Sequence, residues 1–206
     1  MKLTGVNEKT LWQDIIAGDQ QAFKILYEAS ADMLYAYALR YVRDTELIKD
    51  TIHDLFTDLY THRRNLASQV NIKFYLLISF RRKLNAALKK SARLSLQDDM
   101  AAIESHFALT FEAADVQSQI IAKEEQCAAL AQLAAEMNKL PARQKEILYL
   151  KYNCALSYEE IAQLMQISVP TCRTLAYRAI RQLRKELLIT AIPVFGFLLL
   201  AFFKKF

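Results

Sequence analysis

The sequence predicts an all-α protein built of two small helical domains that are joined by an acidic linker. Only three of its 206 residues are Gly and three are Pro, so few positions suit the tight turns that join β-strands. Apolar residues instead recur at intervals of three and four along most of the chain, which is the spacing of one face of an α-helix. A chain of this length can bury two separate cores.

Composition divides the chain into four segments. We expect a first helical domain over residues 1–93 and a second, containing a helix-turn-helix, over residues 118–187. The linker, residues 94–117, has five acids and no Lys or Arg. It is either simply disordered or an acidic strand that occupies a basic nucleic-acid channel of a partner. Residues 188–206 form a largely apolar tail.

Three helices are expected before residue 62. The apolar pattern over residues 11–41 breaks at Gly18-Asp19, which predicts a short helix followed by a long one. Asp44 is placed to cap a third helix. The inward face of this helix consists of Ile48, Ile52, Leu55 and Leu59.

The third helix carries a second face that is acidic. It is formed by Asp50, His53, Asp54 and Thr57. A solvated surface explains this pattern, and so does a surface that binds a partner. The spacing alone leaves both interpretations open.

A fourth helix, from about residue 72 to residue 93, interleaves aromatic residues with cations. The cations are Lys73, Arg81, Arg82, Lys83, Lys89, Lys90 and Arg93. Aromatic rings can stack on unpaired bases while cations bind the backbone, so the pattern favours a single-stranded nucleic acid as ligand. Phe74 and Phe80 fit a core equally well, and the prediction therefore depends mainly on the cations.

A long helix from about residue 119 to residue 140 is followed by Pro141 at a further helix start, and then by two helix starts separated by a tight turn. Ser157 and Glu160 have the spacing of a capping box, which predicts a helix from Ser157. Ser168 is a second capping residue, and Pro170 fits the first turn of a helix that begins there.

The last of these helices is expected to have one apolar face and an opposite face that is basic. Its apolar stripe consists of Cys172, Leu175, Ala176, Ala179 and Leu183. No acid occurs over residues 161–185, and the opposite face presents several arginines. Two short helices with such a second helix make a helix-turn-helix that enters the DNA major groove; a helical hairpin with a solvated basic face is the alternative.

Charge is segregated along the chain. Residues 59–97 and 161–185 together hold 14 of the 27 Lys and Arg residues. The remainder carries 13 basic and 22 acidic residues, so two cationic surfaces are expected on an otherwise acidic protein. Such surfaces are typical of proteins that bind a polyanion, because each neutralised phosphate releases counterions.

The sequence offers no pattern for catalysis, metal binding or a cofactor. The three Cys residues are widely spaced and form no CxxC, so we expect reduced thiols in a cytoplasmic protein. The three His residues show no ligand spacing with them, and no Gly-rich phosphate loop or nucleophile–base set is present. The N-terminus lacks the apolar region of a secretory signal.

Four motifs in this order resemble the extracytoplasmic-function group of bacterial RNA polymerase sigma factors. They are GDQQAFKILYE, IKDTIHDLFTDLY, FYLLISFRRKLNAALKK, and the stretch from LPARQKEILYLKYN through SYEEIAQLMQISVPTCRTLAYRAIRQLRK. The resemblance extends from the N-terminal region to about residue 187. It implies a promoter-specificity subunit that binds core RNA polymerase and directs transcription initiation, with an anti-sigma inhibitor as a candidate further partner.

The resemblance also assigns residues. The polymerase-binding surface would include Asp50, His53, Asp54 and Phe56. The melted downstream promoter element would meet Lys73, Arg81, Arg82, Lys83, Lys89 and Lys90. The double-stranded upstream element would meet Thr171, Arg173, Thr174, Tyr177, Arg178 and Arg181. The acidic linker would run through the polymerase toward the RNA path.

The tail is the segment least similar to this family. Residues 187–203 are apolar apart from Thr190, which is at the short limit of about 17 to 25 residues for a bilayer span. A peripheral membrane or partner contact, or folding back onto the second domain, would explain the tail. The alternatives for the whole protein are a stand-alone helix-turn-helix regulator and a membrane-associated helical interaction protein.

Overall fold

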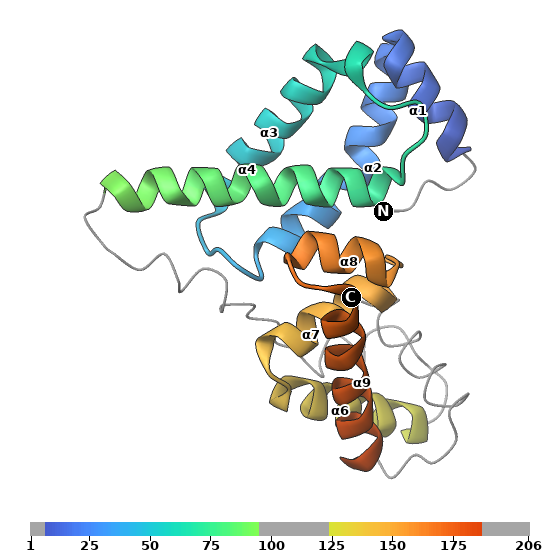
Figure 1. Ribbon diagram of the computed structural model, residues 1–206, viewed down its shortest axis with the longest axis vertical. Helices are drawn as coiled ribbons and strands as arrows, with labels where there is room; N and C mark the ends of the chain where they lie inside the picture. Colours follow the sequence, from blue (N-terminus) through green and yellow to red (C-terminus); the bar gives the residue numbers. More distant parts are fainter. Residues whose placement is uncertain (1–6, 95–123, 187–206) are drawn as a thin grey trace. The chain divides into compact units, whose positions relative to one another are not determined.

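The computed structural model describes residues 7–94 and 124–186, and within these ranges all regular secondary structure is helical (Figure 1). The predicted all-α class is therefore confirmed. The chain divides into two compact units, Met1–Glu104 and Ser105–Phe206. The predicted linker and apolar tail lie almost entirely outside the described residues, so their boundaries stay predictions.

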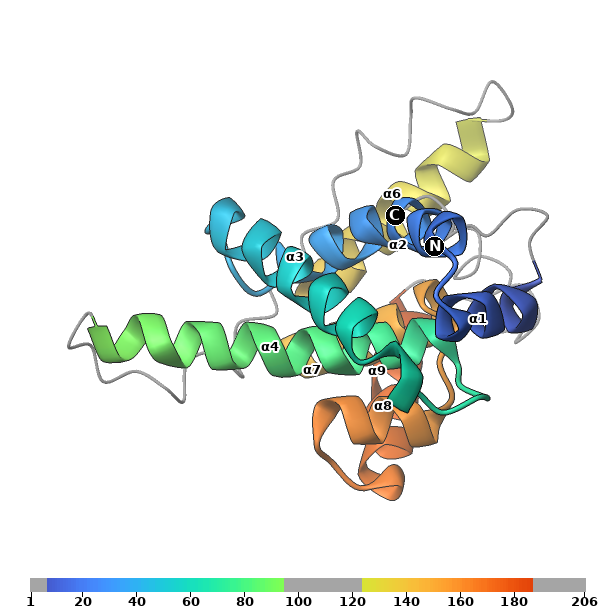
Figure 2. The same ribbon diagram turned by 90° about the horizontal axis from the view of Figure 1, so that it is seen from above.

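Over residues 7–94 the N-terminal unit has four α-helices, in which α3 packs against both α2 and α4, while α1 packs against α2. In both views α4 runs beyond the end of α3 (Figures 1 and 2). The elements of this unit are α1 (Glu8–Ala17), α2 (Gln20–Ala38), α3 (Thr45–Thr61), the short 3₁₀ helix η1 (Arg63–Asn65) and α4 (Ile72–Leu94).

The predicted break between the first two helices is a sharp turn. Gly18 ends α1 with a φ of 96°, a left-handed conformation that favours glycine. A Cβ atom at this position would also lie 3.2 Å from Nε of Arg63. Asp19 then caps α2, because its Oδ1 accepts hydrogen bonds from the backbone N–H groups of Gln21 and Ala22 at 2.7 and 3.1 Å.

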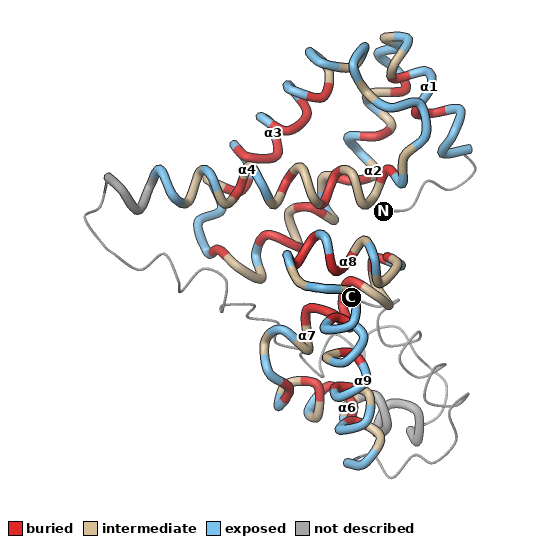
Figure 3. The backbone as a smooth tube through the Cα atoms, viewed as in Figure 1, coloured by how far each residue is buried: buried red, intermediate tan, exposed pale blue. Residues whose placement is uncertain are grey.

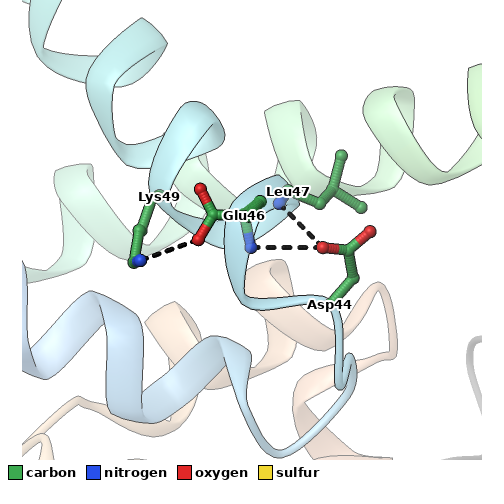
Figure 4. A network of polar contacts seen from close by, with 4 residues as sticks. All are labelled: Asp44, Glu46, Leu47 and Lys49. Atoms are coloured by element: carbon green, nitrogen blue, oxygen red, sulfur yellow. Dashed lines mark hydrogen bonds and ion pairs between the residues drawn. The ribbon is translucent and has the colours of Figure 1, made fainter.

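Asp44 begins α3 as predicted (Figure 4). Its Oδ1 accepts hydrogen bonds from the backbone N–H groups of Glu46 and Leu47, both at 3.1 Å. Glu46 in the first turn also pairs with Lys49 at 2.7 Å. The cap satisfies donors that have no partner within the helix and fixes the residue at which α3 begins. That inward face is the predicted one, since Ile48, Ile52, Leu55 and Leu59 are all buried.

Trp12 ties α1 to the connection between α3 and α4. Its indole Nε1 donates a hydrogen bond of 2.8 Å to the carbonyl oxygen of Ala67. Its ring meets the ring of Tyr75 edge to face, with centroids 5.4 Å apart. The first helix thus holds in place the connection that leads into the cationic helix α4.

The C-terminal unit is organised around α9, which packs against α6, α7 and α8. Pro141 precedes α7, as the sequence predicts. The elements of this unit are α6 (Glu124–Lys139), α7 (Ala142–Leu148), η2 (Tyr149–Asn153), α8 (Tyr158–Met165) and α9 (Val169–Glu186).

A π-helical turn, η2, continues α7 and was not predicted. The backbone N–H of Cys154 donates to the carbonyl of Tyr149 at 3.2 Å, which is the wider spacing of a π-helix. Ala155 follows in the left-handed region with a φ of 57°. Apolar periodicity cannot reveal such a turn, because the pattern on both sides of it still fits an α-helix.

None of the described helices is long and apolar enough to cross a membrane. The apolar tail, residues 188–206, lies outside the described part of the chain, so the predicted membrane contact stays a prediction.

Candidate nucleic-acid interface

The capping box that begins α8 is present in both directions. The backbone N–H of Glu160 donates to Oγ of Ser157 at 3.1 Å, and the backbone N–H of Ser157 donates to Oε2 of Glu160 at 2.8 Å. Leu156 before the cap and Ile161 inside the helix are both buried. These contacts fix the direction in which α8 leaves the preceding loop.

A tight turn separates α8 from α9. Gln166 ends α8 in the left-handed conformation, with a φ of 54°. Oγ of Ser168 accepts a hydrogen bond of 3.2 Å from the backbone N–H of Thr171, so Ser168 caps α9 as predicted. Two helices joined by a turn of this length make a helix-turn-helix.

The buried side of α9 is the narrow stripe that the sequence predicts. Cys172, Ala176, Ala179 and Leu183 are buried, whereas Leu175 is half-buried at the edge of the stripe. Because these side chains are mostly small, α9 lies close to the helices behind it. Burial raises the pKa of the Cys172 thiol, which keeps it neutral at physiological pH.

The opposite side of α9 holds all the residues that we assigned to the upstream element, and each of them is exposed. Figure 3 shows the alternation of buried and exposed positions along this helix. Tyr177 is the most exposed large apolar side chain among those described, at 63%. The exposed residues are Thr171, Arg173, Thr174, Tyr177, Arg178 and Arg181. Their exposure meets the first requirement for contact with DNA, and the contact itself stays a prediction.

Three residues beside this face escaped the sequence analysis. Nη2 of Arg173 donates a hydrogen bond of 3.0 Å to Oε1 of Glu159. The ring of Tyr158 is close to two cations, with Cζ of Arg173 5.9 Å and Nζ of Lys151 4.7 Å from its centroid. The side chain of Lys151 is held by the carbonyl of Leu156 at 3.2 Å. Only Glu159 left a signal in the sequence, because it is an acid in the first turn of a helix, where the helix dipole favours negative charge.

The cations of α4 separate into two groups. Arg82, Lys89 and Lys90 are exposed, while Lys73, Arg81 and Lys83 are half-buried. Nη1 of Arg81 donates to the hydroxyl of Tyr37 at 3.2 Å, and its guanidinium lies 5.4 Å from the ring of Tyr41. Arg81 therefore packs against α2 instead of standing free on the surface.

Lys83 joins α4 to α3 through an ion pair with Asp58. The hydrogen bond from Lys83 holds the pKa of the Asp58 carboxyl below its ordinary value. The ammonium is thus partly neutralised by a neighbour, which leaves the exposed cations Arg82, Lys89 and Lys90 as the stronger candidates for phosphate contact.

Of the four residues assigned to the polymerase-binding surface of α3, three are exposed and one is buried. Asp50, His53 and Asp54 are exposed, but Phe56 is only 3% exposed. Its ring meets those of Phe23 and Tyr27 edge to face at 5.8 and 4.8 Å. Phe56 is therefore a core residue that supports this face from behind, because one turn of helix cannot present every neighbour to solvent.

A groove of about 510 Å³ runs between α3 and α4 beside this face. Asp50 and Asp54 line one side of it and Lys83 and Lys90 the other, with Ala86 among the apolar residues of its floor. The acidic face and the cationic helix are thus adjacent, which the sequence could not show because the two sets lie about 30 residues apart. Among the described residues, no group of three or more His, Cys, Asp or Glu is placed to hold a metal ion.

Comparison with protein families matches residues 130–183 to the family described as sigma-70, region 4. A comparison of the sequence with curated proteins finds no match. The matched residues include η2, both helices of the helix-turn-helix and the turn between them.

Two solved structures share the fold. One is CnrH in complex with the cytosolic domain of CnrY, with a TM-score of 0.50 and 18% identity over 89% of this chain and 99% of that one. The other is the sigma factor RpoE in complex with the anti-sigma factor NepR from Bartonella quintana, with a TM-score of 0.51 and 19% identity over 83% of this chain and 99% of that one. The shared fold and the region 4 match both agree with the resemblance of the sequence motifs to the extracytoplasmic-function group of RNA polymerase sigma factors.

Proposed function

We propose that the protein joins core RNA polymerase as its promoter-specificity subunit and directs transcription initiation. The observation that carries this proposal is the face of α9: within a sigma-70 region 4, a helix-turn-helix exposes arginines on one side and buries small residues on the other. This is the geometry that places a recognition helix in the major groove. The role is one of binding and recognition, and it requires no catalytic residue.

The C-terminal unit binds the upstream promoter element as duplex. Tyr177 lies between the arginines of the exposed face and offers a ring and a hydroxyl for base edges, whereas Arg178 and Arg181 supply positive charge for phosphates. Phosphate contacts fix the register of the helix, and base contacts then select the sequence.

The N-terminal unit binds the melted downstream element through α4. Arg82, Lys89 and Lys90 lie on its exposed surface and follow one another along the helix. A row of cations on a helix suits the backbone of a separated strand. Lys73 and Lys83 contribute at the edge of this surface, and Arg81 supports it through its contact with Tyr37.

The same unit binds core polymerase through the acidic face of α3. Asp50, His53 and Asp54 are exposed there, and the aromatic cluster that includes Phe56 holds α3 against α2. An acidic surface favours a basic partner surface and speeds its association.

Regulation and location follow from the same assignment. Because CnrH and RpoE are each described in complex with a protein partner, and NepR is an anti-sigma factor, we propose that an inhibitor of this class sequesters the chain. The protein acts in the cytoplasm, and residues 188–206 bring part of it to the membrane. Cell fractionation with and without these residues tests the last point, and an unchanged distribution would remove it.

Run-off transcription tests the main proposal. Purified core polymerase is supplied with genomic DNA fragments, with and without the chain, and start sites are mapped. Start sites that appear only with the chain are the expected result. If a folded chain binds DNA in a separate assay but transcription never depends on it, the protein is a stand-alone regulator and the proposal fails.

A further inference from the structure

Arg173 differs from the other arginines on the exposed face of α9. It is bound to an acid of the preceding helix, through the 3.0 Å contact between its Nη2 and Oε1 of Glu159. Within the described residues, Arg178 and Arg181 have no acidic partner. One of the three cations is therefore partly neutralised before any DNA arrives.

The position of Glu159 is fixed by the start of α8. It occupies the first turn of that helix, next to Glu160, whose side chain closes the capping box. The guanidinium of Arg173 is also 5.9 Å from the centroid of the Tyr158 ring, and Nζ of Lys151 is 4.7 Å from the same centroid. The arginine thus has a defined direction, given by a carboxylate and a ring on the neighbouring, capped helix α8.

The contact is not needed to hold the domain together. Both side chains are 62% exposed, and exposed ion pairs contribute little to folding because water and salt screen them. The backbone of Glu159 and the charge of Arg173 both lower the pKa of the Glu159 carboxyl, so the acid stays ionised at physiological pH. Its charge is therefore permanently present at the edge of the DNA-binding face.

We infer that Glu159 is a positioning residue for Arg173: it orients the guanidinium toward one contact on the upstream element and weakens its attraction to DNA of any other sequence. This inference rests on the proposed function of α9. The ligand is duplex DNA, and Glu159 is expected to change how strongly α9 discriminates between the upstream element and other DNA sequences.

The physical reason lies in how the two kinds of binding arise. Binding to random sequence depends on the number of phosphates that free cations neutralise, and an acid beside a cation lowers that number. Binding to a selected site also depends on fixed contacts to bases and phosphates, which an oriented arginine makes at a smaller cost in side-chain entropy. Glu159 therefore lowers the first affinity more than the second.

The test substitutes Glu159→Gln, which keeps the shape of the side chain and removes its charge. The full-length chain is titrated with a random-sequence duplex and with a duplex selected from a random pool by holoenzyme, each over a range of salt concentrations. We expect about three- to tenfold tighter binding to the random duplex, and a slope of log affinity against log salt that is steeper by up to about one. The affinity for the selected duplex should change less. The specificity ratio, which is the affinity for the selected duplex divided by that for the random duplex, should therefore fall.

A matched control removes the same charge elsewhere in the unit. Glu136 lies on a different helix, α6, where it pairs with Lys139 at 2.6 Å, and Glu136→Gln changes the net charge equally. It should leave the specificity ratio unchanged. Equal effects of the two substitutions would mean that net charge alone is responsible, and that result overturns the inference.

Double substitution shows whether Glu159 acts through Arg173. In an Arg173→Ala background, Glu159→Gln should no longer alter the salt slope or the specificity ratio. A persistent effect would overturn the inference while leaving the proposed function intact. Failure of the unsubstituted chain to bind either duplex would instead remove the proposed function of α9 and the inference with it. Thermal unfolding of each variant confirms that the fold is retained.

Discussion

The two cationic helices, α4 and α9, differ in how many of their charges face solvent. All three assigned arginines of α9 are exposed, whereas Arg81 and Lys83 of α4 are half-buried and bound to Tyr37 and Asp58. The cause is packing: the buried side chains of α9 are mostly small and form a narrow stripe, whereas the buried side chains of α4 are larger and form a wider one. A positive charge in the sequence is thus a ligand for DNA only where packing leaves it free.

The comparison matters for function because the two helices are proposed to meet different forms of DNA. A recognition helix in a major groove needs charges on one exposed side, which α9 provides. A helix that follows a separated strand tolerates a mixture of free and packed cations, because rings and a few charges are enough.

The largest effects are expected from two substitutions, each of which weakens the binding of one unit to its own partner. Arg178→Ala should weaken binding to the upstream element by about 1 to 3 kcal/mol and leave polymerase binding intact, because Arg178 is exposed on α9. Asp54→Arg should do the reverse, since it reverses charge on the acidic face of α3. Band-shift and polymerase pull-down assays measure the two effects, and identical defects would mean that the assignment to separate units is wrong.

A second pair of substitutions separates packed from free cations on α4. Arg81→Ala should lower the free energy of unfolding by about 1 to 2 kcal/mol, because it removes the hydrogen bond to Tyr37 and the contact with the Tyr41 ring. Arg82→Ala should leave stability unchanged and weaken binding to a single strand. Urea unfolding and fluorescence titration provide the readouts. If Arg82→Ala proves the more destabilising of the two, the division of α4 into two groups fails.

The helices that precede α4 and α9 start with different caps, and both caps are testable. Ser157→Ala should cost about 1 kcal/mol, because it removes the hydroxyl half of the capping box that begins α8. Asp44→Ala should cost a similar amount at the start of α3, where one oxygen serves two backbone donors. Urea unfolding of the full chain measures both. A negligible cost at Ser157 would show that tertiary packing alone fixes α8.

The smallest effect concerns pH. The pKa of Asp58 is lowered in the folded protein by the hydrogen bond from Lys83, so this pair stabilises the fold fully above the ordinary pKa of Asp. The stabilisation is lost as pH falls through the lowered value. Asp58→Asn should remove this part of the acid dependence, worth less than about 1 kcal/mol because the Asp58 side chain is 55% exposed and water screens the pair. The free energies of unfolding of the two proteins, measured between neutral pH and about pH 3, should approach one another as the pH falls.

Local patterns in the sequence determined the helix starts and the faces. The caps at Asp44 and Ser157 and the break at Gly18 depend on contacts within a few residues, which spacing alone specifies. The apolar stripe of α9 likewise indicated in advance which side of that helix is exposed. The same short-range logic identified the helix-turn-helix and led to the family resemblance.

Tertiary structure alone decided which residues of each predicted helix face are exposed and which are bound to a neighbouring helix. Phe56 is adjacent in sequence to an acidic face yet is buried against Phe23, Arg81 is drawn toward Tyr37, and Glu159 meets Arg173 across a turn. Each outcome depends on a neighbour at a distance in the chain, from 14 residues for Glu159 and Arg173 to 44 for Arg81 and Tyr37. Helical periodicity specifies the angle of a side chain around its own axis, but it carries no information about which other helix lies opposite.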